Sequence, residues 1–207
     1  MRVRRLCTLV FVLAMLFALA PIRAGCASDA VTQDEASELL DAQSRSEYAL
    51  LIGVDHFVSR ADTYPSSTNN VNAMQEVFQG ALNPFRAIIV PPNPVTTVEQ
   101  LTALVQKTFG AAGKNDVCYL YLSTHGVYDP ASGQEPLLLL SDGQTENGIT
   151  PAQLEAAFDG ILGTKVIILD ACNSGAFIGK GLPSLPEKVY FLGEDFKVLT
   201  SSGALEE

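Results

Sequence analysis

Five short apolar segments that do not alternate with polar residues constrain the fold of this chain more than any other feature. They are residues 48–54 (YALLIGV), 86–90 (RAIIV), 117–122 (VCYLYL), 165–169 (KVIIL) and 196–200 (FKVLT). Strands of this kind are buried on both faces, as in parallel sheets covered by helices. Segments with helical spacing of apolar residues separate the first four, at 69–78, 96–109 and 151–162. The sequence therefore predicts an α/β layered fold with right-handed crossovers.

One stretch interrupts the alternation of strands and helices. Residues 127–150 combine Gly, Pro and Asp with a short apolar run at 137–140. Turn-forming residues on both sides of a short apolar run are typical of a connection with its own strands. We expect a loop or a small hairpin beside the sheet.

Composition and charge exclude two classes of protein. The chain has 207 residues, 47% of them hydrophobic and 17% charged, so it can bury a core and is not wholly disordered. Its 13 basic and 23 acidic side chains give a formal net charge of −10. A nucleic-acid binder needs a basic face to displace counterions. No nucleic-acid partner is therefore expected.

The first 27 residues have the pattern of an export signal. Arg2, Arg4 and Arg5 precede an apolar run at 6–20, which is shorter than the roughly 20 residues that cross a bilayer. Residues 1–27 are therefore expected to be a signal peptide that is removed. The polar segment 28–46 is expected to be a linker, and residues 47–207 the folded domain. The predicted location is secreted or periplasmic, in the cell envelope.

The end of this signal offers two kinds of processing. Small residues at Ala24, Gly25 and Ala27 suit an ordinary signal peptidase. The run Arg-Ala-Gly-Cys ending at Cys26 also resembles the bacterial lipoprotein box, in which the cysteine carries the lipid. The alternative is therefore a lipid anchor at Cys26, and this is the only membrane attachment expected.

Two cysteines, Cys118 and Cys172, lie inside the expected domain. Two cysteines in an exported chain could pair. Cys118 lies within an apolar strand, however, where a free cysteine behaves as a small hydrophobe. We favour a free, buried Cys118 over a disulfide.

The residues that carry chemistry follow two of the predicted strands. The third strand runs into Ser123-Thr124-His125-Gly126, and the fourth into Asp170-Ala171-Cys172. Ligand sites of open α/β sheets lie at the carboxyl ends of the strands. A nucleophilic cysteine needs a base such as histidine to form the thiolate, and glycine lets backbone N–H groups approach an oxyanion. His125 and Cys172 are therefore the candidate base and nucleophile, and His56 is a weaker candidate base.

The segments YALLIGV, STHG and VIILDACNSG together resemble the caspase-like superfamily of cysteine peptidases, in its bacterial metacaspase and clostripain-like branches. The resemblance covers residues 47–207. It implies a three-layer α/β/α caspase-like sandwich around a mostly parallel central sheet. The family domain continues beyond its fifth strand. This leaves open whether the chain lacks the C-terminal strand because it is truncated.

Carried over residue by residue, the resemblance implies an endopeptidase that forms an acyl-enzyme on Cys172 and cleaves peptides after Arg or Lys. His125 would be the acid/base, and the backbone N–H groups of Gly126 and Cys172 the oxyanion hole. Asp170 and Ser123 would line the pocket for the basic side chain. From the residues alone, Asp170 could equally cap the turn through backbone N–H groups. No metal or other cofactor is expected, and calcium activation, which occurs in relatives, stays open.

One departure from the family pattern concerns the pocket's charge. Metacaspases carry a second pocket acid in an Asn-Asp-Ala run, and the matching stretch here is Val71-Asn72-Ala73. That charge is therefore expected to be missing, with Glu206 or Glu207 as substitutes. The alternative function is a catalytically incomplete caspase-like interaction or regulatory module.

Overall fold

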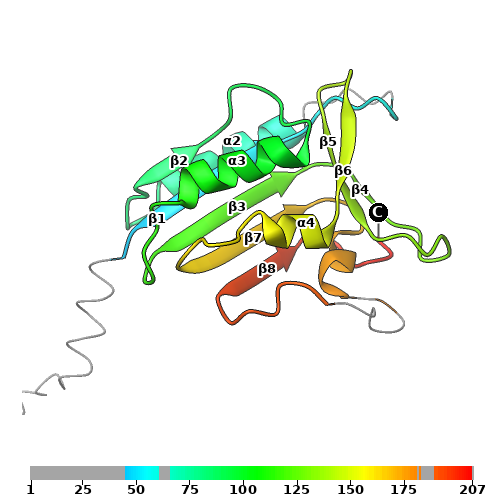
Figure 1. Ribbon diagram of the computed structural model, residues 1–207. Helices are drawn as coiled ribbons and strands as arrows, with labels where there is room; N and C mark the ends of the chain where they lie inside the picture. Colours follow the sequence, from blue (N-terminus) through cyan, green and yellow to red (C-terminus); the bar gives the residue numbers. More distant parts are fainter. Residues whose placement is uncertain (1–44, 61–65, 181, 183–188, 207) are drawn as a thin grey trace, which may run out of the picture.

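A five-stranded parallel sheet forms the centre of the molecule (Figure 1). The computed structural model describes residues 45–60, 66–180, 182 and 189–206. The strands are β1 (Glu47–Gly53), β2 (Ala87–Ile89), β3 (Val117–Ser123), β7 (Thr164–Asp170) and β8 (Phe196–Thr200). Their order is β2-β1-β3-β7-β8, and every pair is parallel. All five strands coincide with the predicted apolar segments to within one residue at each end.

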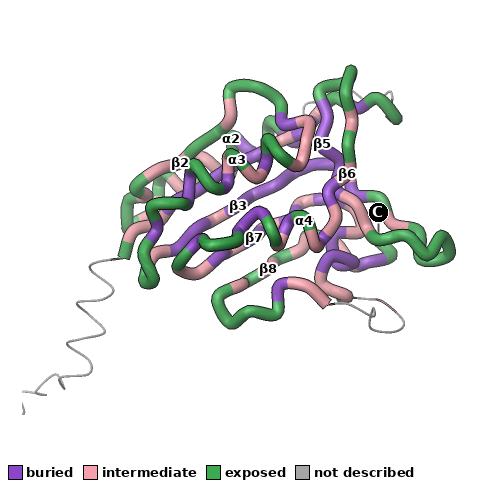
Figure 2. The backbone as a smooth tube through the Cα atoms, in the orientation of Figure 1, coloured by how far each residue is buried: buried purple, intermediate pink, exposed green. Residues whose placement is uncertain are grey.

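Helices cover both faces of this sheet, which makes the three layers visible in Figure 1. Helix α2 (Ser66–Gln79) packs on one face, and α3 (Val98–Phe109) and α4 (Pro151–Ala156) pack on the other. Successive side chains of β1 point to opposite faces of the sheet, and both faces are covered, so its sequence is continuously apolar. Leu50 belongs to the core under α3, Leu51 to the core under α2, and both are fully buried. The α/β sandwich expected from the sequence is confirmed, and Figure 2 shows the buried strands between more exposed helices.

Local capping starts α3 and α4 at well-defined residues. Thr97 and Gln100 form a capping box at α3, and Thr150 and Gln153 form another at α4. Helix α4 ends at Ala156, so the expectation of a helix to residue 162 is wrong. The chain tightens there into a turn with bonds such as Phe158 N–H to the Glu155 carbonyl, and Gly160 follows with φ of 78°.

The stretch at 127–150 forms a small antiparallel sheet beside the main one. It consists of β4 (Gly126–Val127), β5 (Leu137–Ser141) and β6 (Glu146–Ile149). The expected hairpin is therefore present as β5–β6. Its turn is held by Asp142, whose Oδ1 accepts from the N–H groups of Gln144 and Thr145. Because Leu138 and Leu140 are fully buried, this sheet is fixed to the domain core.

Two predicted segments fall largely outside the described residues, namely the signal peptide 1–27 and the linker 28–46. Among the residues that are described, no helix is long and apolar enough to cross a membrane. Localisation, including the lipid anchor at Cys26, stays a prediction.

The start of β7 contains a buried cation. Lys165 is almost fully buried, donates from Nζ to the half-exposed carboxylate of Asp195, and lies 5.2 Å from the centroid of the Phe196 ring. A buried charge needs such a partner because desolvation alone is costly. The hydrogen bond from Lys165 lowers the pKa of Asp195.

Replacing Asp195 by Asn is expected to lower the free energy of unfolding by about 1 kcal/mol at neutral pH, a modest value because water screens half of the carboxylate. A carboxylate whose pKa is depressed in the fold stabilises fully above the unfolded value near 4, and the effect disappears as pH falls through the folded value. Urea unfolding of both proteins between pH 3 and 7 should show the difference closing in acid. The exposed neighbour Glu194→Gln is the control, and a pH-independent difference would contradict this account.

Candidate active site

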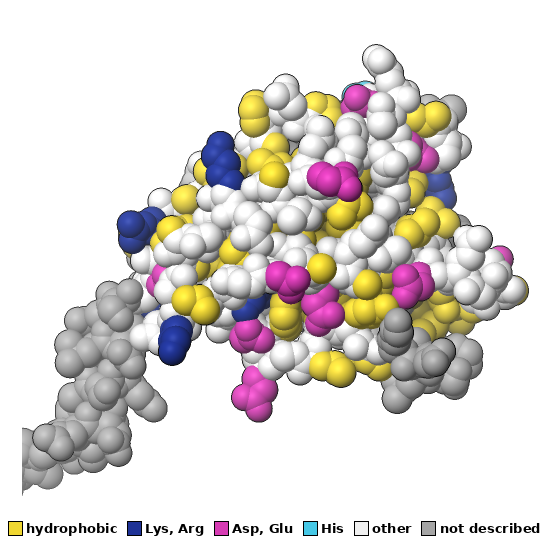
Figure 3. Space-filling model, in the orientation of Figure 1, with side chains coloured by type: hydrophobic (Ala, Val, Ile, Leu, Met, Phe, Trp, Pro, Cys, Tyr) yellow, Lys and Arg dark blue, Asp and Glu magenta, His cyan; other side chains and the backbone are white. Residues whose placement is uncertain are grey.

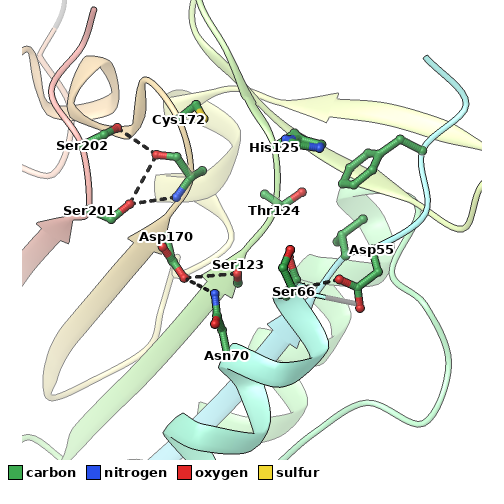
Figure 4. Close-up of a pocket in the computed structure, with 14 residues that line it drawn as sticks. Asp55, Ser66, Asn70, Ser123, Thr124, His125, Asp170, Cys172, Ser201 and Ser202 are labelled. Carbon is green, nitrogen blue, oxygen red and sulfur yellow. Dashed lines mark hydrogen bonds between the residues drawn. The ribbon is translucent and has the colours of Figure 1, made fainter. Parts of the chain in front are cut away.

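The parallel pairing of β3 with β7 brings the two predicted catalytic residues to one edge of the sheet. The register places Ser123 opposite Asp170, and the N–H of Thr124 donates to the Asp170 carbonyl at 3.1 Å. His125 and Cys172 each follow two residues after this matched pair. Figure 4 shows their side chains on two sides of the same cavity.

Contact between backbones holds the two loops together. A Cβ placed on Gly126 would lie 1.8 Å from the carbonyl oxygen of Cys172, so no side chain fits at this position. This explains physically why a glycine must follow His125. The segment after β3 can lie directly against the turn at residues 171–175, called the nucleophile turn below, only because the Cβ is absent.

A ring contact and two hydrogen bonds hold His125 and the loop that carries it. The imidazole ring packs against Phe57 with 4.4 Å between ring centroids and 53° between the ring planes. The backbone is held as well, because its carbonyl accepts from Leu139 N–H at 2.9 Å and Thr124 Oγ1 donates to the Leu139 carbonyl at 2.6 Å. His56, the weaker candidate base, is exposed and does not line the cavity, whereas its neighbour Phe57 does.

The turn after Cys172 has an unusual backbone conformation. Asn173 has φ of 55° and ψ of 13°, in the left-handed region that asparagine tolerates better than most residues. Its N–H donates to the Glu206 carbonyl at 2.7 Å, and its side-chain amide donates to the Ala204 carbonyl at 3.1 Å. The conformation is therefore stabilised by the segment after β8.

That segment, residues 201–206, forms a clamp on the nucleophile turn. Ser201 Oγ accepts from Ala171 N–H at 3.1 Å, and Ser202 Oγ donates to the Ala171 carbonyl at 2.9 Å. Ser202 also bonds Ser174 through backbone and side chain, and its carbonyl accepts from Gly175 N–H. The sequence analysis missed both serines. Their position directly after the carboxyl end of a strand is the signal that could have found them.

The cavity beside Cys172 has a volume of about 560 Å³. The lining side chains that carry polar groups are Asp55, Ser66, Ser67, Asn70, Ser123, Thr124, His125, Asp170, Cys172, Ser201 and Ser202. None of the described lining residues is Lys or Arg. The cavity is thus polar and acidic.

Asp170 is the centre of the hydrogen bonds in this cavity. Its Oδ2 accepts from Tyr121 Oη at 2.6 Å. It also accepts from Asn70 Nδ2 at 3.0 Å and from Ser123 Oγ at 3.2 Å, the two bonds drawn in Figure 4. Burial and the bond to Asp170 raise the pKa of Tyr121, so its phenol stays a donor. All three donors are side chains, so the interpretation of Asp170 as a cap on backbone N–H groups is wrong. Among the described residues, no donor reaches Oδ1, and Asp170 lines the cavity.

The second carboxylate of the cavity is Asp55, which the sequence analysis did not assign to the site. Oδ1 accepts from Ser67 N–H at 2.8 Å, and Oδ2 accepts from Thr68 N–H at 3.0 Å and from the Thr68 hydroxyl. Asp55 thereby caps α2, whose N-terminal dipole favours a negative charge. It follows β1 directly, as His125 and Cys172 follow their strands.

The expected position of the missing acid and the substitute role of Glu206 are corrected, and Glu207 lies outside the described residues. The α2 residue that reaches the cavity is Asn70, which bonds Asp170, whereas Asn72 lies outside the cavity's lining. The helical register decides this, because residues two apart on a helix point in different directions. Glu206 does not supply the missing acid either, because its Oε2 accepts from Gly203 N–H at 2.6 Å and it does not line the cavity.

Two backbone N–H groups are available beside the nucleophile. Leu139 N–H bonds the His125 carbonyl, so Gly126 and Leu138 form a pair without mutual hydrogen bonds, and the Gly126 N–H points away from β5. Within the described residues, the N–H of Cys172 makes no hydrogen bond. Among the described residues, neither N–H group is therefore used in a hydrogen bond.

Cys118 and Cys172 differ sharply in environment. Both are free, as expected. Cys118 lies near the opposite end of β3, and its burial raises the pKa of its thiol to about 12. Cys172 is only partly buried and lines the cavity. Among the described residues, no group of three His, Cys, Asp or Glu side chains could hold a metal ion, and calcium activation stays a prediction.

Replacing Gly126 by Ala is expected to displace the Cys172 turn, since the new Cβ would overlap a backbone carbonyl. The stability cost should be about 1–3 kcal/mol, as for overpacked interiors, and alkylation of Cys172 by iodoacetamide should change in rate. Thermal unfolding and mass spectrometry of the labelled thiol measure the two effects. Gly113→Ala is the matched control, because a Cβ there meets nothing closer than 3.6 Å. Equal behaviour of the two variants would disprove the contact.

Comparison with known proteins shows the family to which the chain belongs. A family model described as the caspase domain matches residues 46–202. No curated protein matches the chain. A crystal structure of a protein from Geobacter sulfurreducens, solved as a structural-genomics target, is similar at 18% identity with a TM-score of 0.46, covering 63% of this chain. This chain spans 51% of the length of that protein. Because the family model covers most of the chain, the protein belongs to the caspase-domain family of cysteine peptidases.

Proposed function

We propose that the protein is an exported cysteine endopeptidase that cleaves peptide bonds after Arg or Lys, with Cys172 as nucleophile and His125 as acid/base. The observation that carries the proposal is the position of Asp170. Asp170 lines the same acidic cavity as Cys172 and His125, and its described hydrogen bonds all use Oδ2, so that no described donor occupies Oδ1. A carboxylate in a partly desolvated pocket binds guanidinium or ammonium groups strongly.

In the proposed reaction, His125 accepts the proton of the Cys172 thiol, and the thiolate attacks the carbonyl carbon of the substrate. The oxyanion that forms accepts from the N–H groups of Gly126 and Cys172. As the C–N bond breaks, His125 gives its proton to the leaving amine, and the acyl group stays on Cys172 as a thioester. Water, deprotonated by His125, hydrolyses the thioester and restores the thiol.

The charges of the cavity support the substrate class. Asp55 and Asp170 are both acidic, and no described lining residue offers a cation to neutralise them. The Tyr121 and Ser123 hydroxyls hold Asp170 in place while leaving Oδ1 for the substrate. The chain has a net charge of −10, and acidic side chains lie on the face shown in Figure 3, which favours the approach of cationic peptides.

A non-catalytic interaction module is the second candidate, and one contact favours it. Asn70, an uncharged amide, uses a hydrogen bond on Asp170 that a substrate cation would otherwise share. Export by the signal at 1–27, with or without lipid at Cys26, belongs to either proposal.

The catalytic proposal is tested with fluorogenic reporters that carry a single Arg or Lys before the leaving group. Wild type should hydrolyse them, and Cys172→Ala should lower kcat by about 10⁴-fold or more. Cys118→Ala is the matched control and should retain activity, since its thiol lies at the far end of β3. Iodoacetamide should inactivate the wild type, because it alkylates the thiol of the nucleophile. Full activity in Cys172→Ala would refute the proposal, and inactivity of a reactive wild-type thiol would favour the interaction module.

Specificity is tested separately at Asp170 and Asn70. Asp170→Asn should reduce kcat/KM for the Arg reporter by roughly 30-fold, because it removes one partner of a partly desolvated pair. Asn70→Asp should raise it by about threefold to tenfold by adding a charge beside Asp170. A neutral reporter with Leu before the leaving group serves as the reference substrate. Unchanged Arg-to-Leu ratios in both variants would exclude Asp170 from the pocket.

A further inference from the structure

A second groove lies beyond the catalytic pair, in the segments that follow each catalytic residue. It has a volume of about 370 Å³. Tyr128, three residues after His125, lines it, as do Ala176 and Phe177, which follow Cys172 by four and five residues. The cavity described above is lined instead by the residues just before the pair, Ser123 and Asp170. His125 and Cys172 therefore stand between the two hollows along both chain segments.

The position relative to His125 indicates which part of a substrate reaches the groove. During acyl transfer the leaving amine must lie against the imidazole that protonates it. From His125 the chain itself continues through β4 into Tyr128, which lines the groove. Three residues of chain span at most about 10 Å, so the groove starts within that distance of His125. An extended peptide covers this distance in about three residues.

The lining of the groove indicates the side chain that fits. Tyr128 and Tyr190 are half-buried, Phe177 is buried, and Pro136 lies beside them. Such aromatic and proline surfaces bind apolar side chains by excluding water. One charge is present among the described lining residues, that of Glu135, whose Oε1 accepts from Tyr190 Oη at 2.9 Å.

We propose that this groove binds the leaving segment of the substrate, with an apolar or aromatic side chain at the second or third position after the cleaved bond, and that Glu135 rejects an acidic one. The proposal rests on the proposed peptidase function and adds a second specificity site to it. The cleaved peptide would thus be recognised on both sides of the bond, by a cation before it and an apolar side chain after it.

Peptides with a quenched fluorophore, a fixed Arg before the cleaved bond and Phe, Lys or Glu at the third position after it test this assignment. Wild type should cleave the Phe peptide about tenfold faster in kcat/KM than the Glu peptide, a typical effect of one well-placed side chain. Glu135→Lys should reverse the order of the Lys and Glu peptides. Glu194→Lys makes the same charge change at an exposed position near the other end of the sheet and should leave the order unchanged.

A second variant tests the apolar contact. Tyr128→Ala should lower kcat/KM for the Phe peptide by about tenfold while leaving the small Arg reporter, which has no leaving segment, unaffected. Tyr119→Ala is the matched control, because this tyrosine packs against Phe78 and Phe85 on the face under α2.

The outcomes separate the two proposals. If wild type cleaves neither reporter nor peptide, the peptidase function fails. If it cleaves both without preference at the leaving positions, or if Glu135→Lys alters the preference for residues before the bond instead, the groove assignment is wrong while the peptidase function stands.

Discussion

The parallel pairing of β3 with β7 is the constraint on which the site depends. These strands pair over seven residues, from Val117 with Thr164 to Ser123 with Asp170. A shift of one residue would turn every side chain of a strand to the opposite face. Ser123 and Asp170 meet on the α2 side, with Tyr121 and Ile168, and a shift of β7 would turn the Asp170 carboxylate toward the apolar core under α3. The hydrogen bonds of Asp170 are thus a direct result of the register.

Beyond the strand ends, specific polar contacts take over from hydrophobic packing. The turn at 171–175 is held by the serines and main-chain groups of the clamp, residues 201–206. Position 175 requires glycine, because a Cβ there would lie only 2.8 Å from Ala204 N. The His125 loop is held by β5 and by the ring of Phe57. The candidate dyad therefore joins two loops that are each supported from outside.

The sequence was sufficient for the framework and for the residues that directly follow β3 and β7. Continuous apolar strands identify a covered parallel sheet, and the strand-end rule then locates His125 and Cys172 together. The same rule applied to β1 and β8 would have added Asp55, Ser201 and Ser202. The position of Asn70 could not be predicted. Asn70 and Asn72 lie on one helix and differ only in the direction they face. The packing of Val71 and Phe78 of this helix against the sheet determines that direction. The early end of α4 depended on a glycine turn that helical periodicity does not detect.

The clamp also sets an order of events during synthesis. Cys172 leaves the ribosome roughly 30 residues before Ser201 and Ser202, because synthesis runs from the N-terminus. During that interval the left-handed conformation of Asn173 lacks both of its carbonyl partners, Ala204 and Glu206. The thiol is therefore made before the residues that complete the geometry around it. A nascent chain with this arrangement carries its candidate nucleophile in a turn that lacks these hydrogen bonds until residues 201–206 have been made.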